Sequence, residues 1–223
     1  MQSPRIFLLS PAHCGGKRAR QILSPAARFP LAEELRSSRG ARLGDVFAFV
    51  SGLYFRGKLT YALRFAAPPA ASDPIIGSGV HIITPSAGLR GPETLVTCEA
   101  IQAFAESDVH PDNAAYRQPL ERSARDLARA IGPACGVVLL GSIAAPKYVD
   151  VLQSIFGDQL LFPVDFVGRG DMSRGGLLLR KAREGVPLEY VPVNGAVLHG
   201  PRPPKLPPIK ERSTTAETNS IRR

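Results

Sequence analysis

Val137-Val138-Leu139-Leu140, followed at once by Gly141-Ser142, is the stretch that decides the fold. Four consecutive apolar residues predict a strand buried on both faces, because a strand with one face in water alternates apolar and polar residues. The small residues after it predict the end of that strand. Similar runs predict further strands at Ile6–Leu9, Val46–Val50, Val80–Ile83, Phe162–Val167 and Leu188–Val191.

Amphipathic segments separate these runs. The clearest carries Leu120, Leu127 and Ile131 on one apolar stripe at helical spacing. Further helices are expected at Lys17–Leu23, Leu59–Ala66, Glu93–Ala105, Pro146–Phe156 and Leu177–Arg183. The alternation of buried strands and helices predicts a three-layer α/β fold: a mostly parallel sheet of about five to six strands with helices on both faces.

The chain has 223 residues, enough for one sizeable core, and 44% hydrophobic with 21% charged residues is typical of a globular protein. We expect residues 1–194 to form a single α/β domain. From about residue 195 Pro, Lys, Arg, Ser and Thr dominate, which predicts a basic, Pro-rich disordered tail at 195–223, extended at Pro201–Pro208. Its Pro-x-x-Pro spacing suits either a protein partner or a plain solvated tail.

Composition disfavours several classes of protein. The chain has an odd number of cysteines, and the three are widely spaced: Cys14, Cys98 and Cys135. This pattern predicts neither a disulfide framework nor a zinc site. The four histidines lack metal-ligand spacing, so we expect no metal, and the sequence specifies neither a cofactor nor an oligomeric state. No run approaches the roughly 20 apolar residues of a membrane helix, and the apolar start is too short for a signal peptide. We therefore expect a cytoplasmic protein without a membrane partner.

The formal net charge is +9 at pH 7. Residues 199–223 contain six Lys and Arg and two Glu, so about half of that charge belongs to the rest of the chain. A basic surface favours anions as partners, although it also serves solubility alone. We expect the partner to be an anionic small molecule or a nucleic acid.

Distinctive segments follow the predicted strands. In a parallel sheet the carboxyl ends of the strands share one edge, and ligands bind in the crevice there. The segments expected at that edge are residues 10–18, 51–58, 84–89, 141–142 and 168–176. Their cations, which are the candidate phosphate ligands, are Lys17, Arg18, Arg56, Lys58, Arg169 and Arg174.

Residues 168–176 are predicted to form a glycine-rich loop between a strand and a helix. The backbone of Gly168, Gly170 and Gly175 is expected to approach the ligand closely, and a helix N-terminus favours an anion. Ser173 is a candidate N-cap and ligand contact. Asp171 is a candidate catalytic base, and an ion pair to a neighbouring arginine that only shapes the loop is the alternative. The segment is neither a P-loop nor a dinucleotide fingerprint.

His13 and Cys14 lie in the first of these segments, among glycines and cations. His13 is a candidate catalytic acid or base, and Cys14 is a candidate nucleophile if the cations lower its pKa. The alternative is an anion-binding loop in which His13 is incidental. Tyr54 and Phe55 suit stacking on a base or packing in the core, and His81, inside a strand, is expected to be structural.

The stretch Ile83-Thr84-Pro85-Ser86-Ala87-Gly88-Leu89-Arg90-Gly91-Pro92-Glu93 resembles a segment in the core domain of archaeosine synthases. It is also similar to one in an uncharacterised family of small bacterial α/β proteins, and in both groups a strand ends in a small polar turn followed by Gly-Leu. The order of elements over residues 6–185 suits the same layout. The resemblance implies a fold related to uracil-DNA-glycosylase-like domains and work on nucleobases in nucleic acid. It implies no particular catalytic residue.

Together these patterns predict a protein that binds a nucleotide, or a nucleobase within nucleic acid, at the carboxyl edge of its parallel sheet. We expect an enzyme that processes the base or its glycosidic bond, with Asp171 or His13 moving protons. One alternative is a non-catalytic module that binds nucleotides or nucleic acid. The other is a protein-interaction domain that acts through its Pro-rich tail.

Overall fold

A computed structural model describes residues 3–144, 146–197, 200–204 and 206 of the chain. Its main sheet has six strands in the order β4-β3-β1-β6-β7-β8. The four middle strands are parallel, and both edge strands are antiparallel. The strands are β1 (Arg5–Leu9), β3 (Val80–Thr84), β4 (Gly88–Arg90), β6 (Gly136–Leu140), β7 (Leu160–Pro163) and β8 (Tyr190–Pro192). A separate antiparallel pair joins β2 (Ala41–Arg42) to β5 (Leu95–Val96).

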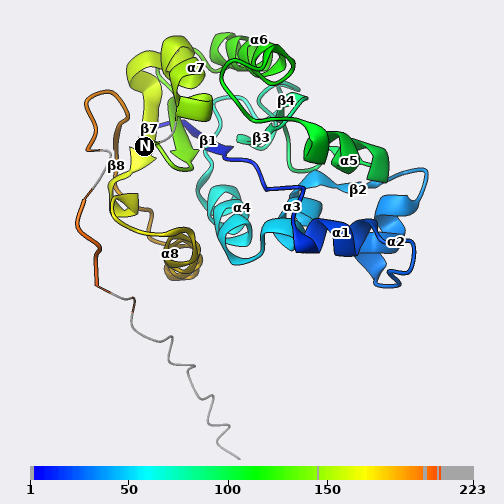
Figure 1. Cartoon of the computed structure of the whole chain (residues 1–223). Coiled ribbons are helices and arrows are strands. Elements are labelled where there is room, and N and C mark those ends of the chain that lie inside the picture. Colours follow the sequence, from blue (N-terminus) through cyan, green and yellow to red (C-terminus); the bar gives the residue numbers. More distant parts are fainter. Residues whose placement is uncertain (1–2, 145, 198–199, 205, 207–223) are drawn as a thin grey trace, which may run out of the picture.

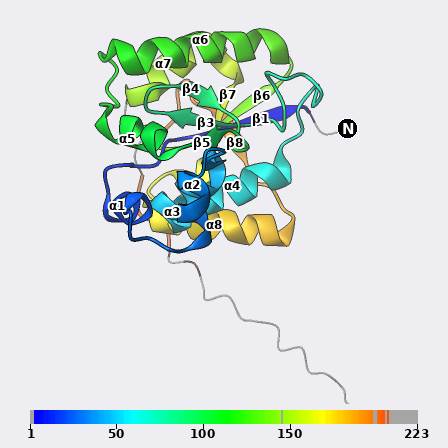
Figure 2. The same ribbon diagram turned by 90° about the vertical axis from the view of Figure 1, so that its right-hand side faces the viewer.

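Helices cover both faces of the main sheet (Figure 1, Figure 2). One buried hydrophobic cluster includes residues of α1 (Lys17–Leu23), α2 (Pro30–Arg36), α3 (Leu43–Ser51), α4 (Leu53–Phe65), α5 (Cys98–Glu106) and α8 (Asp171–Glu184). A second cluster, on the opposite face, includes residues of α6 (Ala114–Ile131) and α7 (Pro146–Phe156). Short 3-10 turns, η1 (Gly157–Gln159) and η2 (Val164–Phe166), flank β7. The predicted three-layer α/β fold is confirmed.

The central strand β1 shows why its sequence is a continuous apolar run. Phe7 and Leu9 belong to the first cluster and Ile6 and Leu8 to the second, and all four are 0% exposed. The strand pairs with β3 on one side and β6 on the other. Because both faces and both edges of β1 are covered, a polar residue would have no solvent to face.

Some predicted elements differ in the structure. The strand predicted at Val46–Val50 is part of α3, where the apolar residues recur at helical spacing on one buried face. The helix predicted from Glu93 begins only at Cys98, because Leu95–Val96 pairs with β2. The strand predicted to continue to Val167 ends at Pro163 and passes into η2. The predicted tail lies mostly outside the described residues.

The glycine-rich loop predicted at residues 168–176 is wrong from residue 171 onward, because that part is helical. Helix α8 begins at Asp171 with Gly170 as its N-cap, so Ser173 lies inside the helix and does not cap it. Gly175 allows close packing instead, because a Cβ there would lie 2.8 Å from the Tyr54 Cα. On the facing helix, a Cβ on Gly57 would lie 2.7 Å from the Gly175 carbonyl oxygen. Glycine at both positions therefore lets the backbones of α4 and α8 touch.

His81 of β3 is buried, as predicted for a structural histidine, and no described residue bonds its Nε2 atom. Burial lowers its pKa to about 4, and a hydrogen bond to the Ile76 backbone offsets part of that shift. As the pH falls, the unfolded chain, with an ordinary histidine pKa of about 6.5, takes up a proton before the folded one does. Stability should therefore fall as the pH drops from about 6.5 towards 4.

We expect wild-type protein to lose about 2 kcal/mol more than a His81→Leu variant between pH 7 and pH 4.5. Urea unfolding of both proteins across this range measures the difference. A variant of the exposed His110, His110→Gln, is the control and should follow the wild type. Equal losses in wild type and His81→Leu would show that His81 does not carry the effect.

Candidate functional site

A cavity of about 650 Å³ lies at the carboxyl edge of the parallel strands. Its lining includes the residues that directly follow two strands, Ser10 after β1 and Pro85 after β3, and also Ser142, two residues beyond β6. The predicted place of the ligand, beyond the strand ends, therefore coincides with a sizeable cavity. Its volume is in the range of small-molecule sites.

The lining of this strand-end cavity combines aromatic rings with groups of both charges. The rings belong to Tyr54, Phe104 and Tyr148. The Asp, Glu, Lys and His side chains of the lining are His13, Lys58, Glu106, Asp108, Lys147 and Asp171. A ligand with a flat face and both donors and acceptors fits such a lining better than a bare polyanion, which the three carboxylates would repel.

Lys58 is the charged residue that the fold buries most deeply among those described, with 1% of its surface exposed. Its Nζ donates hydrogen bonds to the Ser10 carbonyl oxygen at 2.7 Å and to the Ser10 Oγ at 2.8 Å. The same nitrogen lies 4.6 Å from the ring centre of Tyr54 and 4.8 Å from that of Phe55. No described carboxylate forms an ion pair with it.

Burial lowers the pKa of Lys58 to about 7, because a charged amine loses its hydration in the protein interior. The charge of Asp171 raises that pKa and the charge of Arg174 lowers it, both by less than burial does. At neutral pH a large fraction of the Lys58 amine is therefore uncharged. Ionisable groups with strongly shifted pKa values in a cavity are candidates for functional residues.

A short hydrogen-bond chain connects Lys58 to the far wall of the cavity. The Ser10 side chain, which accepts from Lys58, also bonds the Tyr148 hydroxyl. That hydroxyl donates to the Ser142 carbonyl oxygen and accepts from the Ser142 backbone N–H, both at 3.1 Å. A Cβ on Gly141 would lie 2.7 Å from the Tyr148 oxygen, so the absence of a side chain there leaves room for the chain.

Five of the candidate catalytic, stacking and ligand-binding residues line the strand-end cavity: His13, Cys14, Tyr54, Lys58 and Asp171. Asp171 is the first residue of α8, with a side chain 70% exposed, and its Oδ1 lies 3.8 Å from the Arg174 Nη1. The ion pair that was the alternative to a catalytic base is therefore present, within the first turn of α8, and the role of Asp171 as a base stays a prediction. The exposed His13 ring lies beside Gly15, where an added Cβ would come within 3.2 Å of it.

The predicted phosphate-binding arginines mostly bond the protein's own backbone. Arg18 donates to the Phe49 carbonyl oxygen at 3.3 Å, Arg169 to that of Asp165 at 2.9 Å, and Arg174 to that of Phe166 at 3.0 Å. Arg169 also reaches the Ser173 hydroxyl. These contacts hold the turn before α8 and the end of α3 in place. Lys17 and Arg56 are exposed and do not line the cavity.

The glycines predicted to approach the ligand lie outside the cavity lining. Gly168 has a φ of +72°, and a Cβ on it would lie 2.2 Å from the Pro201 carbonyl oxygen. Gly170 is the N-cap of α8 and has open space beside it, and Gly175 lies in the crossing with α4. The structure thus assigns packing or capping positions to these residues and does not bring them into the cavity lining.

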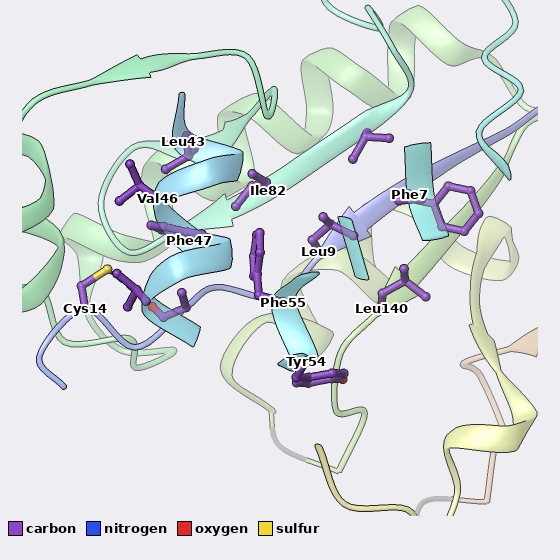
Figure 3. Packing of buried hydrophobic residues seen from close by; sticks show 14 of the residues in the cluster. Phe7, Leu9, Cys14, Leu43, Val46, Phe47, Tyr54, Phe55, Ile82 and Leu140 are labelled. Atoms are coloured by element: carbon purple, nitrogen blue, oxygen red, sulfur yellow. Dashed lines mark hydrogen bonds between the residues drawn. The ribbon is translucent and has the colours of Figure 1, made fainter. Parts of the chain in front are cut away.

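Cys14 packs among the buried side chains beside α3 (Figure 3). Burial raises the pKa of its thiol to about 12, the opposite of the lowered pKa that a nucleophilic thiolate needs. Phe55 is fully buried in the same cluster, whereas Tyr54 is also buried but contributes to the cavity wall. Phe55 therefore packs in the core, whereas Tyr54 packs in the core and lines the cavity, and its stacking on a base stays a prediction.

Several residues that line the cavity were not predicted as site residues from the sequence. The roles of Ser10 and Tyr148 depend on the approach of the residue after β1 to a side chain of α7, which the sequence does not show. Glu106 is the last residue of α5 and Asp108 follows the helix, in a segment that carries no motif. Lys58 did carry a signal: it falls on the same helical stripe as Tyr54, Phe55 and Ala62, all of them buried.

Within the described residues, no group of His, Cys, Asp and Glu is arranged to hold a metal ion, and no helix is long and apolar enough to cross a membrane. Comparison of the chain with models of protein families, with curated proteins and with solved structures finds no match in any of the three. The resemblance to archaeosine synthases therefore stays a prediction.

Proposed function

We propose that the strand-end cavity binds a nucleotide, or a nucleobase within nucleic acid, and that the base enters between its aromatic walls. The observation that carries the proposal is the cavity itself: about 650 Å³ at the carboxyl ends of parallel strands, with Tyr54 and Tyr148 beside fixed polar groups. Aromatic side chains stack on any base, because every base has a flat π-face.

The base, more than the phosphate, is the part of the ligand that this cavity suits. Arg18, Arg169 and Arg174 are already hydrogen-bonded to backbone carbonyl oxygens. The cations that line the cavity, Lys58 and Lys147, are accompanied by carboxylates. Nucleobases carry both donors and acceptors on their edges, and such a mixed lining can pair with both.

Thermal unfolding with a panel of nucleosides, nucleotides, short DNA and short RNA tests the proposal. A ligand at about 100 times its Kd stabilises the native state by roughly 2.7 kcal/mol, which gives a clear rise in Tm. We expect a nucleoside or nucleotide to produce this rise, and Lys58→Met to reduce it. Arg56→Gln, an exposed position on the same helix, is the matched control and should keep it.

The salt dependence separates the two forms of the ligand. Binding through phosphates weakens steeply as salt rises, whereas binding of a base in a cavity does not. A rise in Tm seen only with oligonucleotides at low salt would place the contact on the basic surface and not in the cavity. No rise with any member of the panel would contradict the proposal.

Catalysis on the bound base or its glycosidic bond is a separate part of the proposal, with His13 and Asp171 as the proton-transfer groups. Asp171→Asn distinguishes an enzyme from a binding module. In an enzyme this variant loses turnover of the nucleoside that binds but keeps its Tm shift. In a binding module the variant changes neither, or strengthens binding of an anionic ligand because a negative charge is gone.

A further inference from the structure

A buried amine without an ionic partner is energetically unfavourable, since a charged group in the interior loses its hydration. Lys58 is 1% exposed, and the hydrogen bonds it makes to described residues both end on Ser10. A leucine or methionine would fill the same place on α4 without this penalty. A functional role of the Lys58 nitrogen in the cavity would explain why an amine occupies this buried position.

The hydrogen bonds leave that nitrogen in a reactive arrangement. An uncharged amine has two N–H groups and one lone pair. The Ser10 carbonyl oxygen and the Ser10 Oγ accept from Nζ at 2.7 and 2.8 Å, which accounts for both N–H groups. The lone pair is then free to attack an electrophile in the cavity. The rings of Tyr54 and Phe55 beside Nζ keep its surroundings poor in water.

We propose that Lys58 is the nucleophile of the strand-end cavity and forms a Schiff base with a ligand that carries an aldehyde or ketone group. The proposal rests on the proposed function in its choice of cavity, and it adds the chemical class of the reacting group. Lysines that form Schiff bases are typically desolvated in this way, because only the uncharged amine attacks a carbonyl carbon.

The reaction balances without an oxidant or a metal. The Nζ lone pair attacks the carbonyl carbon, the C=O π-electrons move to oxygen, and a proton passes from nitrogen to that oxygen to give a carbinolamine. Protonation of the hydroxyl then allows water to leave as the C=N bond forms. One amine and one carbonyl thus give one imine and one water. His13 and Asp171 line the same cavity and are placed to carry these protons.

The charge state of Lys58 depends on groups from several elements. Burial lowers its pKa to about 7, and the charges of Asp171 and Arg174 on α8 act on it in opposite directions. The other ionisable side chains that line the cavity are Tyr54 on α4, Tyr148 and Lys147 on α7, His13 and Cys14 after β1, Glu106 at the end of α5, and Asp108 just beyond it. We expect the reaction rate to rise with pH to a half-maximum near the pKa of the amine.

The test uses the full-length protein with pyridoxal 5′-phosphate, a planar aromatic aldehyde, followed by sodium borohydride and peptide mass spectrometry. At neutral pH an amine with a pKa near 7 is uncharged about a thousand times more often than an ordinary lysine. Allowing for its weaker intrinsic nucleophilicity, we expect reductive labelling of Lys58 to exceed that of any exposed lysine by on the order of tenfold. Lys147→Arg removes the other cavity amine and should keep the label on Lys58.

Label confined to exposed lysines, such as Lys17, or no label at all would overturn the proposal. This result needs no variant of Lys58, so a misfolded variant cannot obscure it. A nucleoside that binds in the cavity should slow labelling of Lys58 without slowing that of Lys17. If Lys58 is labelled but no nucleoside protects it or shifts the Tm, the nucleobase proposal fails while the Schiff-base proposal stands. If a nucleoside shifts the Tm but Lys58 is not labelled, the Schiff-base proposal fails while the nucleobase proposal stands.

Discussion

Gly175→Ala is expected to lower the free energy of unfolding by about 3 kcal/mol, because the added methyl group has no space at the crossing of α4 and α8. Its Cβ would lie 2.8 Å from the Tyr54 Cα and 2.9 Å from the Leu53 carbonyl oxygen. Both neighbours are backbone atoms, which cannot rotate away as the end of a side chain does. The helices must therefore separate, and urea unfolding measures the loss.

Gly176→Ala, one residue further along α8, is the matched control. Among the described residues, an added Cβ there meets only the Leu206 Cδ1 atom at 3.7 Å, an ordinary contact. Alanine is favoured over glycine inside a helix, so this variant should gain about 0.5 to 1 kcal/mol. Equal effects of the two substitutions would show that helix propensity, and not the close crossing, decides the outcome at residue 175.

The same crossing also positions the cavity. Lys58 belongs to α4 and Asp171 to α8, so a separation of the two helices moves one wall group relative to the other. We therefore expect Gly175→Ala to weaken ligand binding even under conditions in which the variant is folded. The glycine-rich sequence at residues 168–176 thus matters to the site indirectly, through the backbone contact it allows.

The central strands were predictable from sequence, because burial on both faces leaves a continuous apolar run that needs no tertiary information. Ile6–Leu9 and Val80–Ile83 fall within β1 and β3, and the helix predicted at Lys17–Leu23 has the bounds of α1. Val46–Val50 shows the limit of the same rule. A helix packed against a buried layer also gives a short apolar run, and only the spacing of Leu43 and its neighbours separates the two.

The edge of the sheet that holds the site was also predictable, because parallel strands carry their carboxyl ends together. The roles of the individual cations were not. Arg174 and Lys58 are both cations of segments expected at that edge, yet one bonds a backbone carbonyl and the other enters the cavity wall. Lys58 lies on the buried stripe of α4, whereas Arg174 lies on α8 within reach of the Phe166 carbonyl oxygen, and both placements depend on tertiary packing.

The stability of the protein should rise with pH through the titration of Lys58. In the unfolded chain a lysine keeps its proton up to a pKa of about 10.4. In the folded protein burial lowers the pKa of Lys58 to about 7. Between these two values the unfolded state binds a proton that the folded state lacks, so the free energy of unfolding increases with pH. Below pH 7 both states are protonated and the dependence disappears.

Relative to Lys58→Met, which fills similar space with no titrating group, wild-type protein is expected to gain about 3 kcal/mol between pH 7 and pH 10. The comparison removes the contribution of tyrosines and other lysines, which titrate in both proteins alike. Lys147→Met, at an exposed position of the same cavity, should follow the wild type. If the free energy of unfolding of the wild type changed with pH in parallel with that of Lys58→Met, the buried amine would keep its proton in the folded protein. Lys58 would then be a fixed cation in the cavity wall and not the uncharged nucleophile that Schiff-base formation requires.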